Sequence, residues 1–547
     1  MKKILTLAAA LMLCGSLYAQ IDPTVEVSRQ YKVNIADIDR PLTSDHSVAD
    51  SLQRFDVDFD YSIFNRPYTD LYEFTPYQTD SISKVERRRP PYVMAQFGAQ
   101  YPFVADLQLK SQLFARPRFN VGVDLDGKAS AADLDYLGED DALNAVRIGG
   151  GVSANVKRAW KTGELTAVLG YNTRLYGDTY NGAELDHFYN DFSLDVSLGS
   201  ANPQENSVFY NLDFSYIDGA KRLLQETVVD TTFNNRKMSI KGTLGSSFGD
   251  HRIYVNMLYQ NAIEGKGDQK RNVGILEFMP TYEYVLGRFK LRAGARFGNT
   301  YIGEDAATTI HPDVDVKVEV WKNILWIRGV VSGGNELNSL VEHFRDAPWL
   351  CNGIEGVNYG AEDVIGTKNL VCKLSLESII AGRLALSPYI GYGNYSNQLQ
   401  FRTKKTADLL PYLLPEYCDY GNTEIGMETS WKFKNLTVTG NFRHNNAFTG
   451  TNSPVYMVPE WEADASMEYN FKRRFFLNAA YTYRSERLSW DGTIPDYSDL
   501  TVVLTAVLNR HFAVYAKGGN LLNHQNYRYL DIPELPLNIG GGLRINF

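Results

Sequence analysis

The sequence predicts an all-β protein, built as a large antiparallel transmembrane β-barrel of about 22 strands with an irregular N-terminal leader. Three observations lead to this fold class. Of the 547 residues, 35 are Tyr, 27 are Phe and 44 are Gly, which is typical of strands with one wet face. After the N-terminus no apolar run reaches about 18 residues, the length that a membrane-spanning helix needs. From residue 92 onward, apolar and polar residues alternate in successive segments, which indicates half-buried strands.

Residues 1–19 are predicted to be a secretory signal peptide. A charged start precedes an apolar run over residues 4–13, and small residues precede an expected cleavage after Ala19. The alternative is lipidation at Cys14, which we disfavour because Leu13 stands where a small residue is wanted. Either signal predicts an exported protein.

Residues 20–91 are predicted to form an irregular leader, periplasmic or lumenal. The segment is rich in Asp, and Pro90 and Pro91 at its end cannot donate to a β-ladder. One apolar patch, residues 59–77, is too small to make a core. We expect the leader to fold into or under the barrel, where its acidic residues would meet inward-facing Arg and Lys.

Residues 92–547 are predicted to form the barrel. In residues 251–260, for example, Ile253, Val255 and Met257 share one face, and polar residues such as Asn256 and Gln260 take the other. Short turns such as 249–250 and 287–288 alternate with longer connections. The expected long connections are 129–144, 179–189, 219–234, 264–271, 302–312, 334–365, 396–420, 447–458, 488–495 and 522–536. This layout is typical of an outer-membrane barrel, and an even strand count places both termini in the periplasm.

The C-terminus carries a more specific signal. Residues 518–527 read Gly-Gly-Asn-Leu-Leu-Asn-His-Gln-Asn-Tyr, and the last strand ends on Phe547. This end resembles the barrels of TonB-dependent receptors, and the strand count is similar to that family's 22. The resemblance implies that Phe547 is the signal read by the barrel-insertion machinery. It also implies solute binding or passage across the outer membrane.

The N-terminal end departs from that family. Its members carry a folded plug domain before the barrel, and residues 20–91 are too short for one. We therefore expect a barrel that resembles a TonB-dependent receptor without the plug. The expected partners are outer-membrane lipid, the insertion machinery, an unknown solute and periplasmic or surface proteins.

The sequence gives no sign of an enzyme or a cofactor. The eight histidines are dispersed, with no HExxH and no GxSxG motif. The formal net charge of −9 argues against nucleic acid, because phosphate binding needs a cationic stripe. We expect no catalytic, cofactor-binding or metal-binding residues.

The connection over residues 335–363 is unusually acidic. A cation site is conceivable there, since hard cations take several oxygen ligands. We prefer a solvated surface loop with a short helical stretch around residues 337–344.

Three cysteines follow the signal peptide. Cys351 and Cys418 fall in expected outer loops, where a disulfide between them would staple two loops over the mouth. Cys372 lies on the apolar face of its strand and is expected to face lipid.

Seven basic residues alternate with apolar neighbours and are expected to line a wet lumen. They are Arg147, Lys157, Lys290, Arg292, Arg296, Arg484 and Arg544. Simple hydration of a polar interior explains them equally well.

Two functions remain open from the sequence. The first is an outer-membrane barrel that binds a solute or lets it pass, as a channel or a receptor-like barrel. The second is a non-conducting scaffold for outer-membrane protein partners, which the missing plug makes reasonable.

Overall fold

The computed structural model describes residues 92–135, 142–200, 208–225, 228–266, 269–351, 365–450 and 453–547. The expected signal peptide and leader lie outside these residues. In the described part of the chain, no helix is long and apolar enough to cross a membrane.

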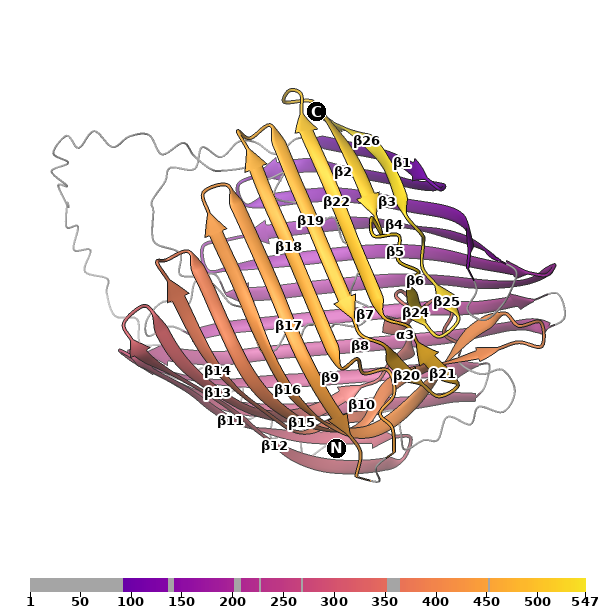
Figure 1. Cartoon of the computed structure of the whole chain (residues 1–547). Coiled ribbons are helices and arrows are strands. Elements are labelled where there is room, and N and C mark those ends of the chain that lie inside the picture. Colours follow the sequence, from indigo (N-terminus) through magenta and orange to yellow (C-terminus); the bar gives the residue numbers. More distant parts are fainter. Residues whose placement is uncertain are drawn as a thin grey trace. The chain divides into compact units, whose positions relative to one another are not determined.

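One antiparallel sheet of 22 strands makes up the barrel (Figure 1). The first strand pairs with the last, from Met94 with Asn546 to Tyr101 with Ile539, and this pairing closes the sheet. The fold class and the strand number are thus confirmed. The strands are β1 Val93–Tyr101, β2 Val104–Arg116, β3 Phe119–Leu134, β4 Leu143–Ala159, β5 Gly163–Tyr180, β6 Ala183–Ser200, β7 Val208–Gln225, β8 Val228–Phe248, β9 His251–Lys266, β10 Gln269–Leu286, β11 Phe289–Ile302, β12 Asp305–Trp321, β13 Leu325–Leu337, β14 Ile365–Ile380, β15 Leu384–Lys405, β16 Pro411–Phe433, β17 Leu436–Phe448, β18 Trp461–Phe471, β19 Phe475–Arg484, β22 Tyr497–Val507, β23 Phe512–Gly519 and β26 Asn538–Asn546.

The two faces of the sheet differ as the alternation predicts. Ile253 and Met257 of β9 are each 51% exposed, and Ile539 of β26 is also exposed. On the same strand as Ile539, Arg544 is buried on the inner side. Apolar side chains therefore point outward, as they do in a barrel surrounded by lipid.

At one end of the barrel β1 begins and β26 ends, and short turns such as that between β10 and β11 lie there too. We call it the turn end. The opposite end is the loop end. Several connections predicted to be long there are instead paired strands. β5 and β6 stay in register until Tyr180 meets Ala183, and Asn181 and Gly182 turn with φ of 49° and 80°.

Five of the predicted long connections are wrong for the same reason. The connections 179–189, 219–234, 264–271 and 302–312 fall largely within β5–β12, and 396–420 falls largely within β15 and β16. A membrane strand needs only about ten residues, and β8 has 21. Where the outer face of a strand no longer meets lipid, apolar alternation fades although the hydrogen-bond ladder continues.

Short elements gather at the loop end (Figure 1). They are the helix α3 Leu340–His343, the hairpin of β20 Arg487–Ser489 with β21 Gly492–Ile494, and the hairpin of β24 Tyr527–Tyr529 with β25 Ile532–Pro533. The largest buried apolar cluster lies among these elements and the neighbouring wall.

Candidate functional site

The chain turns into the lumen at the end of β13. The pairing of β13 with β14 shifts register between Ser332 and Gly334, a bulge that redirects the strand. A Cβ on Gly334 would lie 2.6 Å from the Arg296 guanidinium, so a larger residue there would displace that side chain. The next backbone amide, of Asn335, donates to the buried Glu277 carboxylate at 3.1 Å. We call the segment that follows, residues 338–351, the strap.

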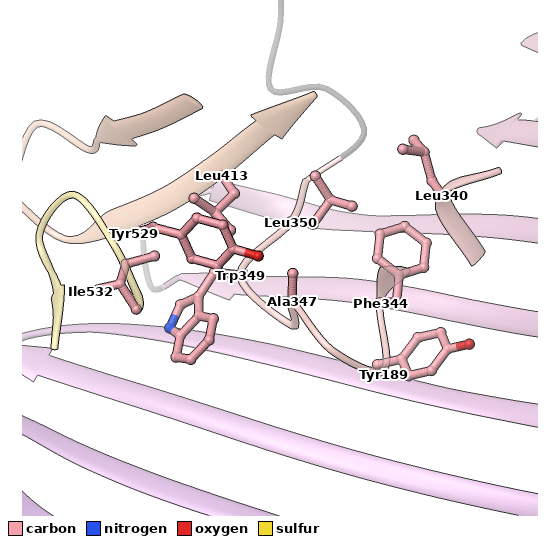
Figure 2. Close-up of a cluster of buried hydrophobic side chains, with 9 residues drawn as sticks. All are labelled: Tyr189, Leu340, Phe344, Ala347, Trp349, Leu350, Leu413, Tyr529 and Ile532. Carbon is pink, nitrogen blue, oxygen red and sulfur yellow. The ribbon is translucent and has the colours of Figure 1, made fainter. Parts of the chain in front are cut away.

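The strap buries an apolar face. Its buried side chains include Leu340, Val341, Phe344, Trp349 and Leu350, none more than 4% exposed. Figure 2 shows the cluster that five strap residues form with side chains from other segments: Leu340, Phe344, Ala347, Trp349 and Leu350 with Tyr189, Leu413, Tyr529 and Ile532. The expected helical stretch is present as α3, whereas the expectation of a solvated surface loop is wrong over the described residues 335–351. Apolar burial outweighs the acidic residues that suggested solvent.

Side chains on neighbouring strands also hold the main chain of the strap. These strands are β5, β6, β7 and β9, and we call the inner face of β5–β9 the strap wall. Arg174 donates to the carbonyl of Arg345, Tyr189 to that of Val341 at 3.2 Å, Lys221 to that of Pro348, and Glu264 accepts from the amide of Leu340 at 2.8 Å. These contacts satisfy backbone groups that burial would otherwise leave unpaired.

The strap wall also pairs with strap side chains. Asp191 binds the Arg345 guanidinium through both carboxylate oxygens, and Nε of Arg345 lies 3.0 Å from Oδ2. The Trp349 indole donates to Asp178 at 2.9 Å. Lys237 meets Glu342 at 2.5 Å. Asp178, Asp191 and Lys237 are all nearly unexposed, so the strap covers charges of both signs.

A second segment crosses above the strap. The outer ends of β15 and β16, residues 399–415, which we call the cap hairpin, bring Leu413 to the strap by backbone bonds with Trp349 at 2.9 Å and Cys351 at 2.8 Å. At the hairpin's tip, Leu410 packs with Leu143 of β4 and Leu185 of β6. β6 and β16 lie far apart around the sheet, so they can meet only across the mouth. Strap and cap hairpin together lie across the loop end of the lumen.

Two of the seven predicted lumen cations support the strap. Arg147 contacts Asp178 at 2.5 Å, and its Cζ lies 5.0 Å from the centre of a Trp349 ring. Arg296 packs against Gly334 and pairs with Glu277 at 3.3 Å.

The other five predicted cations contact partners elsewhere on the sheet. Lys157 pairs with Glu164, Lys290 with Glu283, Arg292 with Asp313, Arg484 with Glu462 and Asp464, and Arg544 donates to Gln96 at 3.1 Å. The seven residues therefore do not form one site. The sequence did not predict the strap or the strap wall, although the apolar spacing of residues 340–350 could have indicated a buried segment.

The predicted disulfide is not formed, since Cys351 and Cys418 are both free thiols. Cys351 is buried at the end of the strap, and Cys418 lies on β16 rather than in a loop. Burial raises the pKa of the Cys351 thiol to about 11. In the part of the chain that the structure describes, no group of three His, Cys, Asp or Glu could hold a metal ion.

The C-terminal motif builds a compact turn beside β22. The backbone amide of Asn520 donates to the Asp499 carboxylate at 2.9 Å, and the Asn520 side chain binds the backbone of His524. Asn526 binds both backbone groups of Ser498, at 2.8 and 2.9 Å. After the last strand, the amide of the exposed Phe547 donates to the carbonyl of Val93 at 2.8 Å. The residues that carry the family resemblance thus fix the end of the barrel.

Comparison with solved structures defines the class of fold. No known family profile matches the chain, and no curated protein matches it by sequence. Solved structures match at 11% identity: the copper transporter OprC with a TM-score of 0.62, over 83% of this chain and 82% of that one, and the siderophore receptor PirA from Acinetobacter baumannii with 0.62, over 84% and 81%. The ferric yersiniabactin uptake receptor FyuA from Yersinia pestis has a TM-score of 0.63 at 11% identity, over 84% and 81%.

These similarities concern the fold. The barrel has the architecture of TonB-dependent outer-membrane receptors, as the C-terminal resemblance predicted.

Proposed function

We propose that this protein is an outer-membrane barrel whose lumen binds a solute or lets it pass, and that the strap and cap hairpin gate the loop end. The observation that carries the proposal is the strap itself. A 22-stranded barrel leaves an aqueous bore unless something fills it. Here a segment with a buried apolar face and polar anchors on several strands lies across that bore.

The proposal also covers the orientation of the barrel in the membrane and the role of the leader. Both termini lie in the periplasm, the loop end faces outward, and Phe547 serves the insertion machinery. The leader, residues 20–91, acts from the periplasmic side. The lumen cations form part of the polar path.

Planar-bilayer conductance tests the proposal on three proteins. These are the full mature chain, a variant without residues 20–91, and a variant whose residues 339–350 are replaced by a Gly-Ser segment of equal length. We expect little conductance from the full chain and a large stepwise conductance when the strap is replaced. Heat-modifiable migration in gels verifies that each barrel is folded.

The outcomes separate the candidates. Conductance on deletion of the leader alone would make the leader the gate. The closed loop end also favours the second candidate, a scaffold for protein partners. No conductance from any of the three folded proteins would contradict passage and favour the scaffold.

A further inference from the structure

The strap wall has the composition of a binding site. It presents carboxylates at Asp178, Asp191 and Glu264 and ammonium groups at Lys221 and Lys237, all nearly unexposed beneath the strap. Charged groups are seldom buried unless they are paired. Asp178 and Glu264 have cationic partners on the barrel, Arg147 and Arg271, whereas the strap supplies Arg345 to Asp191 and Glu342 to Lys237. If the strap leaves, the lumen gains a wall of fixed charges of both signs.

Many of the contacts that the strap wall makes with the strap are contacts with its peptide backbone. Lys221, Arg174 and Tyr189 donate to three carbonyls of the strap, and Glu264 accepts from one amide. Such contacts do not depend on the side chains of the bound segment. A second peptide that adopts the same helical turn would offer the same carbonyls and amides.

Two positions on the strap wall select side chains. Asp191 receives the Arg345 guanidinium in a two-oxygen contact, the geometry that favours arginine. Trp349 packs against both Arg147 and the Tyr176 ring, whose centre is 5.1 Å from its own, and donates to Asp178. The two residues are four apart in sequence, so the wall recognises a cationic and an aromatic side chain at that spacing.

We infer that the strap wall is a peptide-binding site and that the strap is an internal occupant that a peptide solute displaces. The ligand class is an oligopeptide with arginine followed four residues later by tryptophan. The inference rests on the proposed solute-binding function and names its substrate class.

Binding is tested on the full mature chain with residues 339–350 replaced by the Gly-Ser segment. The probes are a synthetic peptide of residues 338–350, an unrelated peptide with Arg and Trp at the same spacing, a scrambled version of that peptide, and a linear glucose oligosaccharide of similar mass. Fluorescence anisotropy with labelled probes gives the affinities. We expect both Arg-Trp peptides to bind, and the scrambled peptide and the oligosaccharide to bind at least about ten-fold more weakly.

Asp191→Asn in the strap-replaced chain supplies the matched control. It removes the charge that receives arginine, so binding of the unrelated Arg-Trp peptide should weaken about ten-fold or more. Asp313→Asn, which changes a buried carboxylate on β12 away from the strap wall, should leave that affinity unchanged.

Three results would overturn the inference. In the first, neither Arg-Trp peptide binds to a folded strap-replaced barrel. In the second, only the peptide with the strap's own sequence binds. In the third, the oligosaccharide binds as tightly as the Arg-Trp peptides. The conductance of the same variant separates the two proposals. Conductance without peptide binding would remove the inference and leave passage intact, whereas block of that conductance by the peptide would support both.

Discussion

Two arcs of the inner wall carry the same kinds of charged side chain but pair them in different ways. On β10–β14, the charges pair within the sheet: Arg292 with Asp313 at 3.1 Å and Arg328 with Asp315 at 2.6 Å on adjacent strands, and Lys317 of β12 with Glu377 of β14 at 2.5 Å across β13. On the strap wall, Asp178, Asp191 and Glu264 bind strap residues 76 to 171 positions away in the sequence. The sheet alone supplies the partners of the first arc. In the second arc the sheet supplies Arg147 to Asp178 and Arg271 to Glu264, and the remaining partners are present only while the strap is docked.

The difference locates where the molecule can move. Separating β11 from β12 to release Arg292 would break a continuous ladder of backbone bonds. Releasing Arg345 from Asp191 requires only that the strap lift, since the wall strands keep their own pairing. Local opening is easiest where few backbone bonds must break, so the strap arc is the expected gate.

The largest effect is expected from a matched pair of carboxylate changes, Asp191→Asn and Asp315→Asn. Asp191→Asn takes a buried charge from Arg345, which should weaken docking of the strap by roughly 3 kcal/mol, the low end for a broken buried pair because Arg345 is partly exposed. The native thiol Cys351 reports opening in a Cys372→Ser, Cys418→Ser background. Maleimide labelling of Cys351 should accelerate about a hundred-fold, because each 1.4 kcal/mol is ten-fold.

Asp315→Asn breaks a contact of the same kind in the arc without the strap, because Asp315 binds the Arg328 guanidinium through both carboxylate oxygens. Labelling of Cys351 should stay at the wild-type rate there. Equal acceleration in both variants would show that the two arcs are one cooperative unit and would remove the distinction.

A smaller effect is expected from Trp349→Phe. The change keeps an aromatic ring against Tyr176 and Arg147 but removes the indole N–H that Asp178 accepts at 2.9 Å. Asp178 retains Arg147 at 2.5 Å, so the loss should be about 1–2 kcal/mol and labelling of Cys351 should accelerate about ten-fold. Trp490→Phe is the control, because Trp490 stacks on Tyr456 outside the strap. No change with Trp349→Phe would mean that the indole bond does not hold the strap.

The barrel could be predicted because its signal is local and repeated. The alternation around Ile253 and Met257 reflects a wall with lipid on one side and water on the other, so the sequence alone indicates which side chains face out. The prediction failed where that asymmetry ends. Around Asn181 the outer face of the hairpin is polar and the inner face packs under the cap hairpin, so only the hydrogen-bond ladder shows that the strands continue.

The strap could not be predicted in the same way. Glu342 and Asp346 suggested solvent, and nothing near them in sequence indicates that Lys237 or Arg528 lies opposite. Partners so distant in sequence are brought together only by closure of the barrel. Arg147 was predicted to face the lumen, but its role beside Trp349 depends on where the strap lies.

The smallest effect concerns pH and the Cys351 thiol itself. Burial raises the pKa of this thiol from about 9 to about 11 when the strap is docked, and Lys221 and Tyr412 are its titratable neighbours. Through this thiol the docked state binds more protons between these values, whereas Lys221, whose pKa burial lowers to about 7, contributes with the opposite sign. The thiol's contribution to docking is full below about pH 9 and is lost as the pH rises toward 11. At pH 9.5 the change in docking free energy should be about 1 kcal/mol or less.

Tryptic cleavage after Arg345 measures this opening without using the thiol as its own reporter. Cleavage should accelerate between pH 8 and pH 9.5 more in the native chain than in Cys351→Ser, once trypsin's own pH dependence is removed with a peptide substrate. Because the hydroxyl that replaces the thiol in this variant does not titrate in this range, the difference between the two chains isolates the thiol. Identical pH profiles would mean that Cys351 stays protonated whether the strap is docked or lifted, and that the strap end does not leave the apolar cluster when the rest of it opens.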